Sequence, residues 1–390
     1  MIDRVKISPA QFMVTVICFV QSSSLLSSFF TSLAKQDSWM VLIAGSLVVL
    51  PLYFALFSLF KRFPGKTLVQ INDAVFGKYL GKLISVLYIW FFLTLGSLNL
   101  RDLGNFAQKS IMPNTPVDAM IIPFILLCAW AVRHGLDVIT RYNSLFFVVS
   151  LIIMIIATAF VLNIMCIDNL LPMLDQEPLA YVQSTHISAT IPCGELVVLT
   201  MIVPNVKVSP KKLPKYWLGG FAIAVTYVFM IVFRDTTVLG NTLPLFAMPP
   251  FETLRLINVG HALSRVEILF ATVLIILLFA KISLIFYAVS LAISQLFNIK
   301  NFKSLVFSTG AILCIYSLTM YESVMEHSTA GSSTHPVLWT FFEYFLPFLT
   351  LAVAVLRGLK PTSDANKQQD QSAEAQPAPA YTDQQEGASS

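Results

Sequence analysis

The sequence predicts an all-α integral membrane protein with ten transmembrane helices. Three observations lead to this fold class. Of the 390 residues, 56% are hydrophobic and only 12% are charged, which is about half the charged share of an ordinary soluble domain. The apolar residues gather in runs of the length that spans a bilayer, roughly 17–25 residues. Lysine and arginine are divided between alternate loops in the way that sets membrane topology.

The apolar runs define the predicted transmembrane domain, residues 1–360. The ten runs cover residues 10–33, 39–60, 81–100, 117–132, 143–165, 187–206, 216–234, 264–296, 303–321 and 337–356. The segment Thr67–Lys78 is too short and too polar to span, and its apolar residues recur at helical spacing, so we expect a surface helix on a loop. Residues 361–390 contain no large aliphatic side chain, which predicts a disordered cytoplasmic tail.

The basic residues test this count of spans. With the N-terminus in the cytoplasm, eighteen of the 25 lysines and arginines fall on the inner side, six fall in outer loops, and Lys281 alone lies inside a span. Because cytoplasmic loops are enriched in lysine and arginine, the pattern supports ten spans with both termini in the cytoplasm. The basic residues form no compact stripe, so the net charge of +4 indicates no nucleic-acid partner.

Four residues interrupt the sixth apolar run. Pro192-Cys193-Gly194-Glu195 lies at the centre of the run that extends to Val203. Proline and glycine release backbone groups from the helical hydrogen bonds, and lipid cannot satisfy those groups. A carboxylate at that depth costs about 2.5–3.5 kcal/mol on insertion scales. Such a break is typical of a span that faces a polar cavity, as in the substrate sites of transporters.

Two further polar features lie inside predicted spans. The first span contains Ser22, Ser23 and Ser24; such clusters loosen a transmembrane helix or allow close helix packing, and both interpretations stay open. Lys281 lies near the middle of the eighth span, too far from either interface for its side chain to reach water. Its ammonium must therefore point into the bundle, toward carboxylates, carbonyls or water. For such a group we favour a coupling or gating role over a structural brace.

The remaining polar residues argue for no catalytic or metal centre. Arg265 and Glu267, at the outer mouth of the eighth span, follow the loop Met248–Glu252 and are interpreted first as interfacial anchors and only second as ligand contacts. The five cysteines form no Cys-x-x-Cys pair, so we expect no structural zinc and no other cofactor. The five histidines are scattered and no catalytic motif is present, so an enzyme is not expected.

The positions of the two interruptions indicate an internal repeat. They lie in spans one and six, five helices apart. Because five is odd, the second group of five helices enters the membrane from the opposite side. That is the geometry of an inverted repeat, in which the broken first helices of the two halves meet near the midplane. The helix ends exposed there suit a zwitterion such as an amino acid.

Short motifs along residues 7–357 resemble those of the spore germination permeases. They are Ile7-Ser-Pro9, Lys61-Arg-Phe-Pro-Gly-Lys-Thr67, Leu170-Leu-Pro172, Gly194-Glu195, Arg265-Val-Glu267 and Lys281-Ile-Ser283. The resemblance implies the amino acid–polyamine–organocation superfamily and its LeuT-like fold, a five-plus-five inverted repeat with helices one and six broken. Members of the family are the B subunits of nutrient germinant receptors. The resemblance thus implies A and C subunits as partners and the spore inner membrane as the location.

The chain also departs from this family. Many members carry glycines in the break of the first span, where this chain has Ser22–Ser24, and a proline at its outer end, where this chain has Thr31-Ser-Leu33. We therefore expect a pocket of different shape, whose ligand need not be alanine.

The resemblance implies a sensor of a small nutrient, with an amino acid as the first candidate. The ligand-lining residues would be Ser22, Ser23, Ser24, Cys193 and Gly194, while Glu195 would receive a ligand amine or hold the break in place. In sodium-coupled relatives of this fold a cation lies between spans one and eight. Lys281 would supply a built-in charge there, so we expect no sodium requirement. One alternative is a proton-coupled amino-acid transporter with Lys281 or Glu195 as proton carrier, and another is a scaffold that only assembles the receptor.

Overall fold

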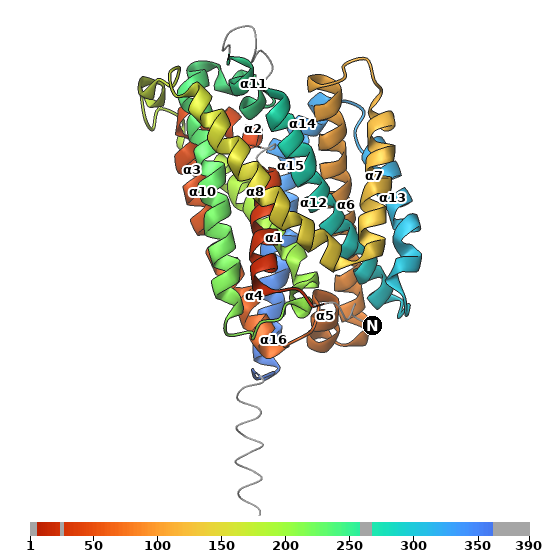
Figure 1. Cartoon of the computed structure of the whole chain (residues 1–390). Coiled ribbons are helices and arrows are strands. Elements are labelled where there is room, and N and C mark those ends of the chain that lie inside the picture. The colour runs from red at the N-terminus through yellow and green to blue at the C-terminus, as the bar shows by residue number, and fades with distance from the viewer. Residues whose placement is uncertain (1–5, 24–26, 258–266, 362–390) are drawn as a thin grey trace, which may run out of the picture.

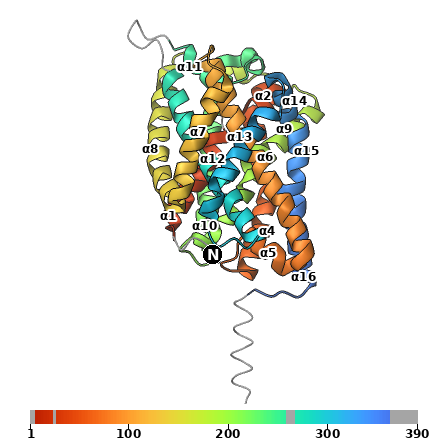
Figure 2. The same ribbon diagram turned by 90° about the vertical axis from the view of Figure 1, so that its right-hand side faces the viewer.

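A computed structural model describes residues 6–23, 27–257 and 267–361. Its long helices run roughly side by side as one bundle (Figures 1 and 2). Over the described ranges, eight helical segments are long and apolar enough to cross a membrane. They are Ser28–Arg62, Lys78–Ser110, Val117–His134, Leu136–Val161, Leu213–Leu245, Glu267–Leu296, Phe302–Thr319 and Thr334–Leu356. The predicted all-helical membrane fold is therefore confirmed.

Of the ten predicted spans, the first and the sixth do not form single long helices in this set of eight. The first begins as α1 (Pro9–Ser22) and resumes as α2 (Ser28–Ala34), which joins the next span through η2 (Lys35–Asp37). The sixth begins as α9 (Pro178–Ser188), then becomes a π-helix, η4 (Ala189–Cys193), and the 3₁₀ segments η5 (Gly194–Met201) and η6 (Val203–Asn205). The irregular stretch of the sixth span coincides with the interruption read from the sequence there, and α1 ends at Ser22, where the sequence predicts the interruption of the first span. The count of ten spans stays a prediction with which this arrangement agrees.

Two of the short motifs prove to be helix starts. Ser8 Oγ accepts a hydrogen bond from the Gln11 backbone N–H at 3.1 Å, and Gln11 Oε1 accepts one from the Ser8 N–H at 2.8 Å. Thr67 and Gln70 make the same reciprocal pair at α5 (Leu68–Phe76). Each capping box satisfies backbone donors that the first turn leaves free. Helix α5 forms within Thr67–Lys78, where the sequence predicts a surface helix, but five of its nine residues are buried and none is exposed, because it packs against α6.

The other helices follow in chain order. They are α3 (Ser38–Val48), α4 (Leu50–Arg62), α6 (Lys78–Ser110), α7 (Val117–His134), α8 (Leu136–Val161), η3 (Ile167–Leu170), α10 (Leu213–Leu239), η7 (Gly240–Leu245), α11 (Pro249–Arg255), α12 (Glu267–Leu296), η8 (Phe302–Leu305), α13 (Val306–Thr319), α14 (Val324–Ser332), α15 (Thr334–Thr340), the π-helix η9 (Phe341–Phe345) and α16 (Leu346–Leu356). Gly135, with a φ of 102°, separates α7 from α8, because other residues rarely adopt that backbone angle. The segment Met248–Glu252, expected as a loop, contributes to α11.

The bundle has two distinct ends. Figure 1 shows α2, α11 and α14 at one end, and α5 with the start of the described chain at the other. We call them the α11 end, which the charge distribution predicts to be outer, and the α5 end. Helices α6 and α12 are the most deeply buried of the long helices among the described residues. They pack against each other, and α12 also packs against α1 and η5, so α12 lies beside both interrupted spans.

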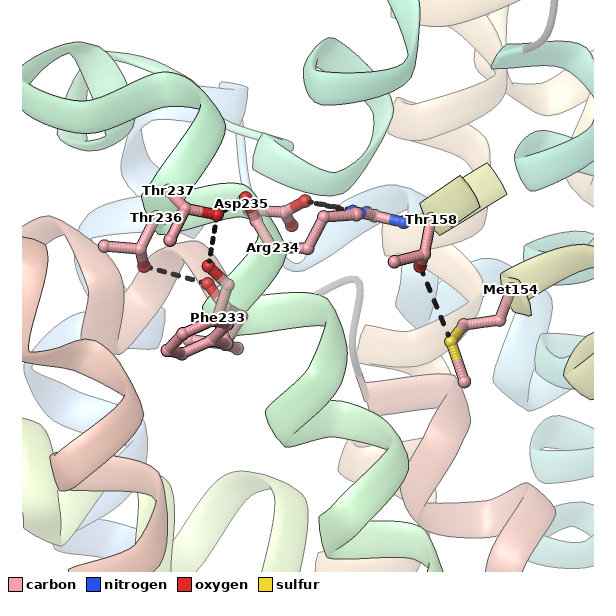
Figure 3. A network of polar contacts seen from close by, with 8 residues as sticks. Met154, Thr158, Phe233, Arg234, Asp235, Thr236 and Thr237 are labelled. Atoms are coloured by element: carbon pink, nitrogen blue, oxygen red, sulfur yellow. Dashed lines mark hydrogen bonds and ion pairs between the residues drawn. The ribbon is translucent and has the colours of Figure 1, made fainter. Parts of the chain in front are cut away.

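One charged pair is buried where the sequence suggested an outer loop. Helix α10 continues to Leu239, five residues beyond the expected end of the seventh span, and both Arg234 and Asp235 are almost completely buried. Arg234 Nε and Nη2 donate to Asp235 Oδ1 at 2.9 and 2.7 Å (Figure 3). Because the two charges neutralise each other, the helix can continue through a buried environment. Arg234 thus belongs to an internal ion pair with Asp235 and is not an interfacial anchor.

Candidate functional site

The break in span six is held by two tyrosines from other helices. Pro192 lies inside the π-helix η4, where a proline cannot donate a backbone hydrogen bond. The hydroxyl of Tyr53, on α4, donates to the Cys193 carbonyl at 2.8 Å, and that of Tyr344, on η9, donates to the Ala189 carbonyl at 2.9 Å. Protein side chains therefore satisfy carbonyl groups that lipid could not, and they hold the irregular backbone in one conformation.

Lys281 connects the breaks of the two interrupted spans. Its Nζ lies 2.5 Å from Glu195 Oε2 in η5 and donates to Ser23 Oγ, at the end of α1, at 2.9 Å. The three residues are 1%, 1% and 4% exposed. The side chain thus points inward, as the sequence predicted, and a single ammonium group joins α12 to the end of α1 and to η5.

The ammonium also has an aromatic neighbour. The ring centroid of Phe19, one turn before Ser23 on α1, lies 5.1 Å from Lys281 Nζ, within the range of a cation–π interaction. A carboxylate, a hydroxyl and a ring face therefore surround the charge. A buried ammonium and carboxylate in contact form a net-neutral unit, which an apolar bundle tolerates where either ion alone would be costly.

The other predicted site residues occupy different positions. Ser22 Oγ donates to the Phe19 carbonyl at 2.6 Å, within its own helix. Cys193 is buried and takes part through its carbonyl group. Ser24 and Arg265 lie outside the described residues. Glu267 is the first residue of α12 and lines a cavity at the α11 end of the bundle.

Gly194 is required for space and not for backbone freedom. Its φ of −69° and ψ of −32° are ordinary helical values. A Cβ atom added there would lie 2.1 Å from Oε2 of Glu343, far inside any permitted contact. Glu343 is a fully buried carboxylate in η9 whose two oxygens have no hydrogen-bond partner in the described part of the chain. Sequence reasoning missed Glu343, although a carboxylate inside the run 337–356 was a visible signal.

Three adjoining cavities lead from the α11 end toward Glu195. Their volumes are about 320, 60 and 20 Å³. The first two share Lys109, Ala247 and Met248 as lining residues, and the last two share Phe29, Asp102 and His327. Glu195 lines the innermost cavity, which at about 20 Å³ has room for about one water molecule. The site is therefore closed in this structure, and a larger ligand requires it to open.

His327 lies at the narrowing between the outer and inner cavities. Its Nε2 is 3.5 Å from Asp102 Oδ1, and its ring stacks on Tyr321 with centroids 5.1 Å apart. Burial lowers the pKa of His327 from its ordinary value of 6.5 to about 4, and the positive charge of Arg101 acts in the same direction. The ring is therefore uncharged at neutral pH, which permits its packing inside the narrowing.

A family model described as "Spore germination protein" matches residues 6–324. The chain belongs to this family. It is 29% identical to spore germination protein KB of Bacillus subtilis (strain 168) over 359 residues, which cover 90% of this chain and 95% of that protein. It is 25% identical to spore germination protein YndE of the same organism over 362 residues, 90% of this chain and 97% of that protein. The resemblance inferred from the short motifs is confirmed.

Two solved structures share the fold of this chain. Mhp1, a nucleobase-cation-symport-1 family transporter in a closed conformation with bromovinylhydantoin bound, matches with a TM-score of 0.69 at 13% identity, over 89% of this chain and 78% of that one. MhsT in complex with L-phenylalanine matches with a TM-score of 0.62 at 13% identity, over 89% and 97%. At such identities the likeness shows the fold alone, and it confirms the LeuT-like fold class.

Several residues of the candidate site were not identified from the sequence. Tyr53 and Tyr344 are ordinary aromatic residues of apolar spans, and nothing near them in the sequence points to span six. Asp102 and His327 lie 225 positions apart, and the histidines were set aside as scattered. Only the tertiary structure brings His327 of α14 within 3.5 Å of Asp102 on α6.

Proposed function

We propose that this chain is the B subunit of a nutrient germinant receptor of the spore inner membrane, assembled with A and C subunits and with both termini in the cytoplasm. A small nutrient, an amino acid in the first instance, binds between spans one, three, six and eight. One observation carries the proposal. Lys281 bridges Ser23 and Glu195, the polar residues of the two breaks, and the cavities from the α11 end lead to Glu195.

A zwitterion suits this pair of charges. Its carboxylate can replace Glu195 as partner of Lys281, while its ammonium pairs with Glu195, so that no buried charge is left alone. An amino acid is larger than the innermost cavity of about 20 Å³, so it binds only an opened state. A ligand that binds one state better than the other shifts the population toward that state, and this shift is the germination signal. A neighbour of the same fold binds L-phenylalanine, which makes amino acids the first class to test.

Binding by the purified, full-length receptor tests the nutrient site. Calorimetry with the twenty amino acids, glucose and adenosine is expected to give heat of binding for at least one amino acid. Ser23→Phe, which fills the space beside Lys281, is expected to abolish it. The matched control is Ser58→Phe, at a residue of α4 whose side chain points away from the centre of the bundle. This variant is expected to bind the nutrient normally. Binding that survives Ser23→Phe places the nutrient elsewhere.

The germination response distinguishes a sensor from a scaffold. Spores carrying Glu195→Gln or Ser23→Phe are expected to lose the fall in optical density that nutrients induce, while the receptor still assembles in the membrane. A scaffold role predicts an unchanged response in both variants. Co-purification of the A and C subunits with each variant shows that assembly is intact.

Two experiments address ion coupling. Because Lys281 carries its charge between α12 and Ser23 of α1, nutrient binding is expected to be equal in sodium and choline buffers, and a sodium requirement would contradict this role of Lys281. The buried Lys281–Glu195 pair also favours a second candidate function, a proton-coupled amino-acid transporter. In proteoliposomes, accumulation of a labelled amino acid driven by a proton gradient would support the transporter over the sensor.

A further inference from the structure

The carboxyl group of Glu343 is buried in the helix bundle and has no hydrogen-bond partner in the described part of the chain. It lies in the π-helix η9 of the last span, is 0% exposed, and neither of its oxygens accepts or donates a hydrogen bond among the described residues. It contacts the backbone of span six at Gly194, the residue before Glu195. A buried carboxylate normally accepts several hydrogen bonds or pairs with a cation.

Among the described residues, none of the groups that face Glu343 donates a hydrogen bond to it, although the Tyr88 hydroxyl has no other partner there. The titratable and charged neighbours on the elements packed around it are Tyr53 of α4, Tyr88 of α6, Cys193 of η4, Glu195 of η5, Lys281 of α12 and its own neighbour Tyr344. The Lys281 ammonium is bonded to Glu195 and Ser23. The Tyr53 and Tyr344 hydroxyl groups donate to backbone carbonyls of η4. Together, Glu343, Glu195 and Lys281 leave one negative charge uncompensated if all three are ionised.

We propose that Glu343 is a proton-binding site and carries its proton in this closed state. A single added positive charge balances the cluster. Whether that charge is a proton or a larger cation depends on the space beside Glu343. Glu343 lines none of the three cavities that lead to Glu195, and its Oε2 lies so close to Gly194 that a Cβ atom there would clash with it. A proton needs no cavity, whereas a hydrated cation or a ligand ammonium does.

The position of Glu343 links its proton to opening of the site. It contacts η5 at Gly194, and Glu195 is the next residue, so separation of η9 from η5 exposes both carboxyl groups. Water then stabilises the ionised form of Glu343 and the proton leaves. This coupling rests on the proposed function, because it requires a nutrient-bound open state. The protonation of the closed state does not.

Infrared spectroscopy of the full-length protein in lipid nanodiscs tests the proton site. At neutral pH the carbonyl stretching band of a protonated carboxylic acid is expected in the wild-type spectrum, and Glu343→Gln is expected to remove a component of it. Glu326→Gln, at an exposed glutamate of α14, is the matched control and is expected to leave the band unchanged. A band that is identical in Glu343→Gln and wild type overturns the proposal.

A second variant keeps the test decisive if Glu343→Gln does not fold. Glu343→Asp retains an acid with a shorter side chain, so the same component is expected to shift in frequency instead of disappearing. A Glu343→Asp spectrum without that shift overturns the proposal. A wild-type protein that lacks the band and is stabilised by sodium also overturns it, because a cation then takes the place of the proton. Coupling is measured separately with a pH-indicator dye. Nutrient binding without proton release leaves the receptor function standing and refutes only the link to opening.

Discussion

Removal of the Lys281 ammonium tests whether the buried ion pair holds the two broken spans together. Nζ lies 2.5 Å from Glu195 Oε2, and the two side chains are 0% and 2% exposed. At an effective dielectric constant of about 20, their attraction is roughly 7 kcal/mol. Desolvation of each ion costs several kcal/mol and offsets most of this gain. Lys281→Met is nevertheless expected to destabilise the fold by about 3–5 kcal/mol, because it leaves the Glu195 carboxylate buried without its partner.

The double variant separates the pair from its surroundings. Lys281→Met combined with Glu195→Gln removes both charges, so its loss of stability is expected to be smaller than the sum of the two single losses. The assay is equilibrium denaturation of the four proteins in mixed micelles, from which the coupling energy is calculated. Lys300→Met, at an exposed lysine after α12, serves as control and is expected to cost less than about 0.5 kcal/mol. Additive single losses would refute the argument that the pair acts as one neutral unit.

Three further predictions concern stability. Gly194→Ala is expected to lower the free energy of unfolding by about 1–3 kcal/mol, because its Cβ would lie 2.1 Å from Glu343 Oε2. Glu343→Ala in the same chain is expected to restore part of this loss, and an unchanged denaturation midpoint in Gly194→Ala would contradict the prediction. Arg234→Met, which breaks a pair with side chains 2% and 3% exposed, is expected to cost about 3–5 kcal/mol, whereas Arg255→Met, in a pair 57% and 27% exposed, should cost about 0–1 kcal/mol; equal losses would be inconsistent with burial as the cause. The pKa of His327 in the folded protein, about 4, lies below its ordinary value of 6.5, so the unfolded chain binds more protons between these pH values, and the stabilisation is complete above pH 6.5 and is lost toward pH 4. His327→Gln should remove up to roughly 3 kcal/mol of this pH dependence of the unfolding free energy, measured by thermal melts from pH 7 to 4. A variant whose stability depends on pH as strongly as that of the wild type would contradict the prediction.

Much of the fold was predictable because the bilayer imposes local rules. A run of apolar residues must be helical in lipid, since its backbone groups have no other partners, and its length follows from the bilayer thickness. The same rules predicted interruptions at Ser22–Ser24 and Pro192–Glu195 and an inward-facing Lys281. Errors arose where a charge was neutralised by a neighbour. Arg234 was assigned to a loop because the sequence did not show that Asp235 would pair with it inside α10.

The candidate site was predictable only in part, because its contacts join distant segments. Ser23 and Lys281 are 258 positions apart, and Glu195 and Lys281 are 86 apart. The inverted-repeat argument placed the two breaks near each other, but it did not indicate which oxygen Lys281 would bond. Nothing in the sequence indicated that Tyr53 and Tyr344 satisfy the carbonyl groups of η4. Those contacts depend on the register with which α4 and η9 pack against span six.

The sequence by itself determined the solvent of each segment: which residues lie in lipid, which spans are interrupted, and that a lysine is held inside the membrane. It did so because each residue makes its own contribution to the free energy of transfer into hydrocarbon. Only the tertiary structure decided how each buried polar group is satisfied. It gave Lys281 its carboxylate, explained Gly194 as space for Glu343, and left the Glu343 carboxyl without a hydrogen-bond donor among the residues that the structure describes. These outcomes depend on distances of a few ångströms between helices, and no local pattern in the chain encodes them.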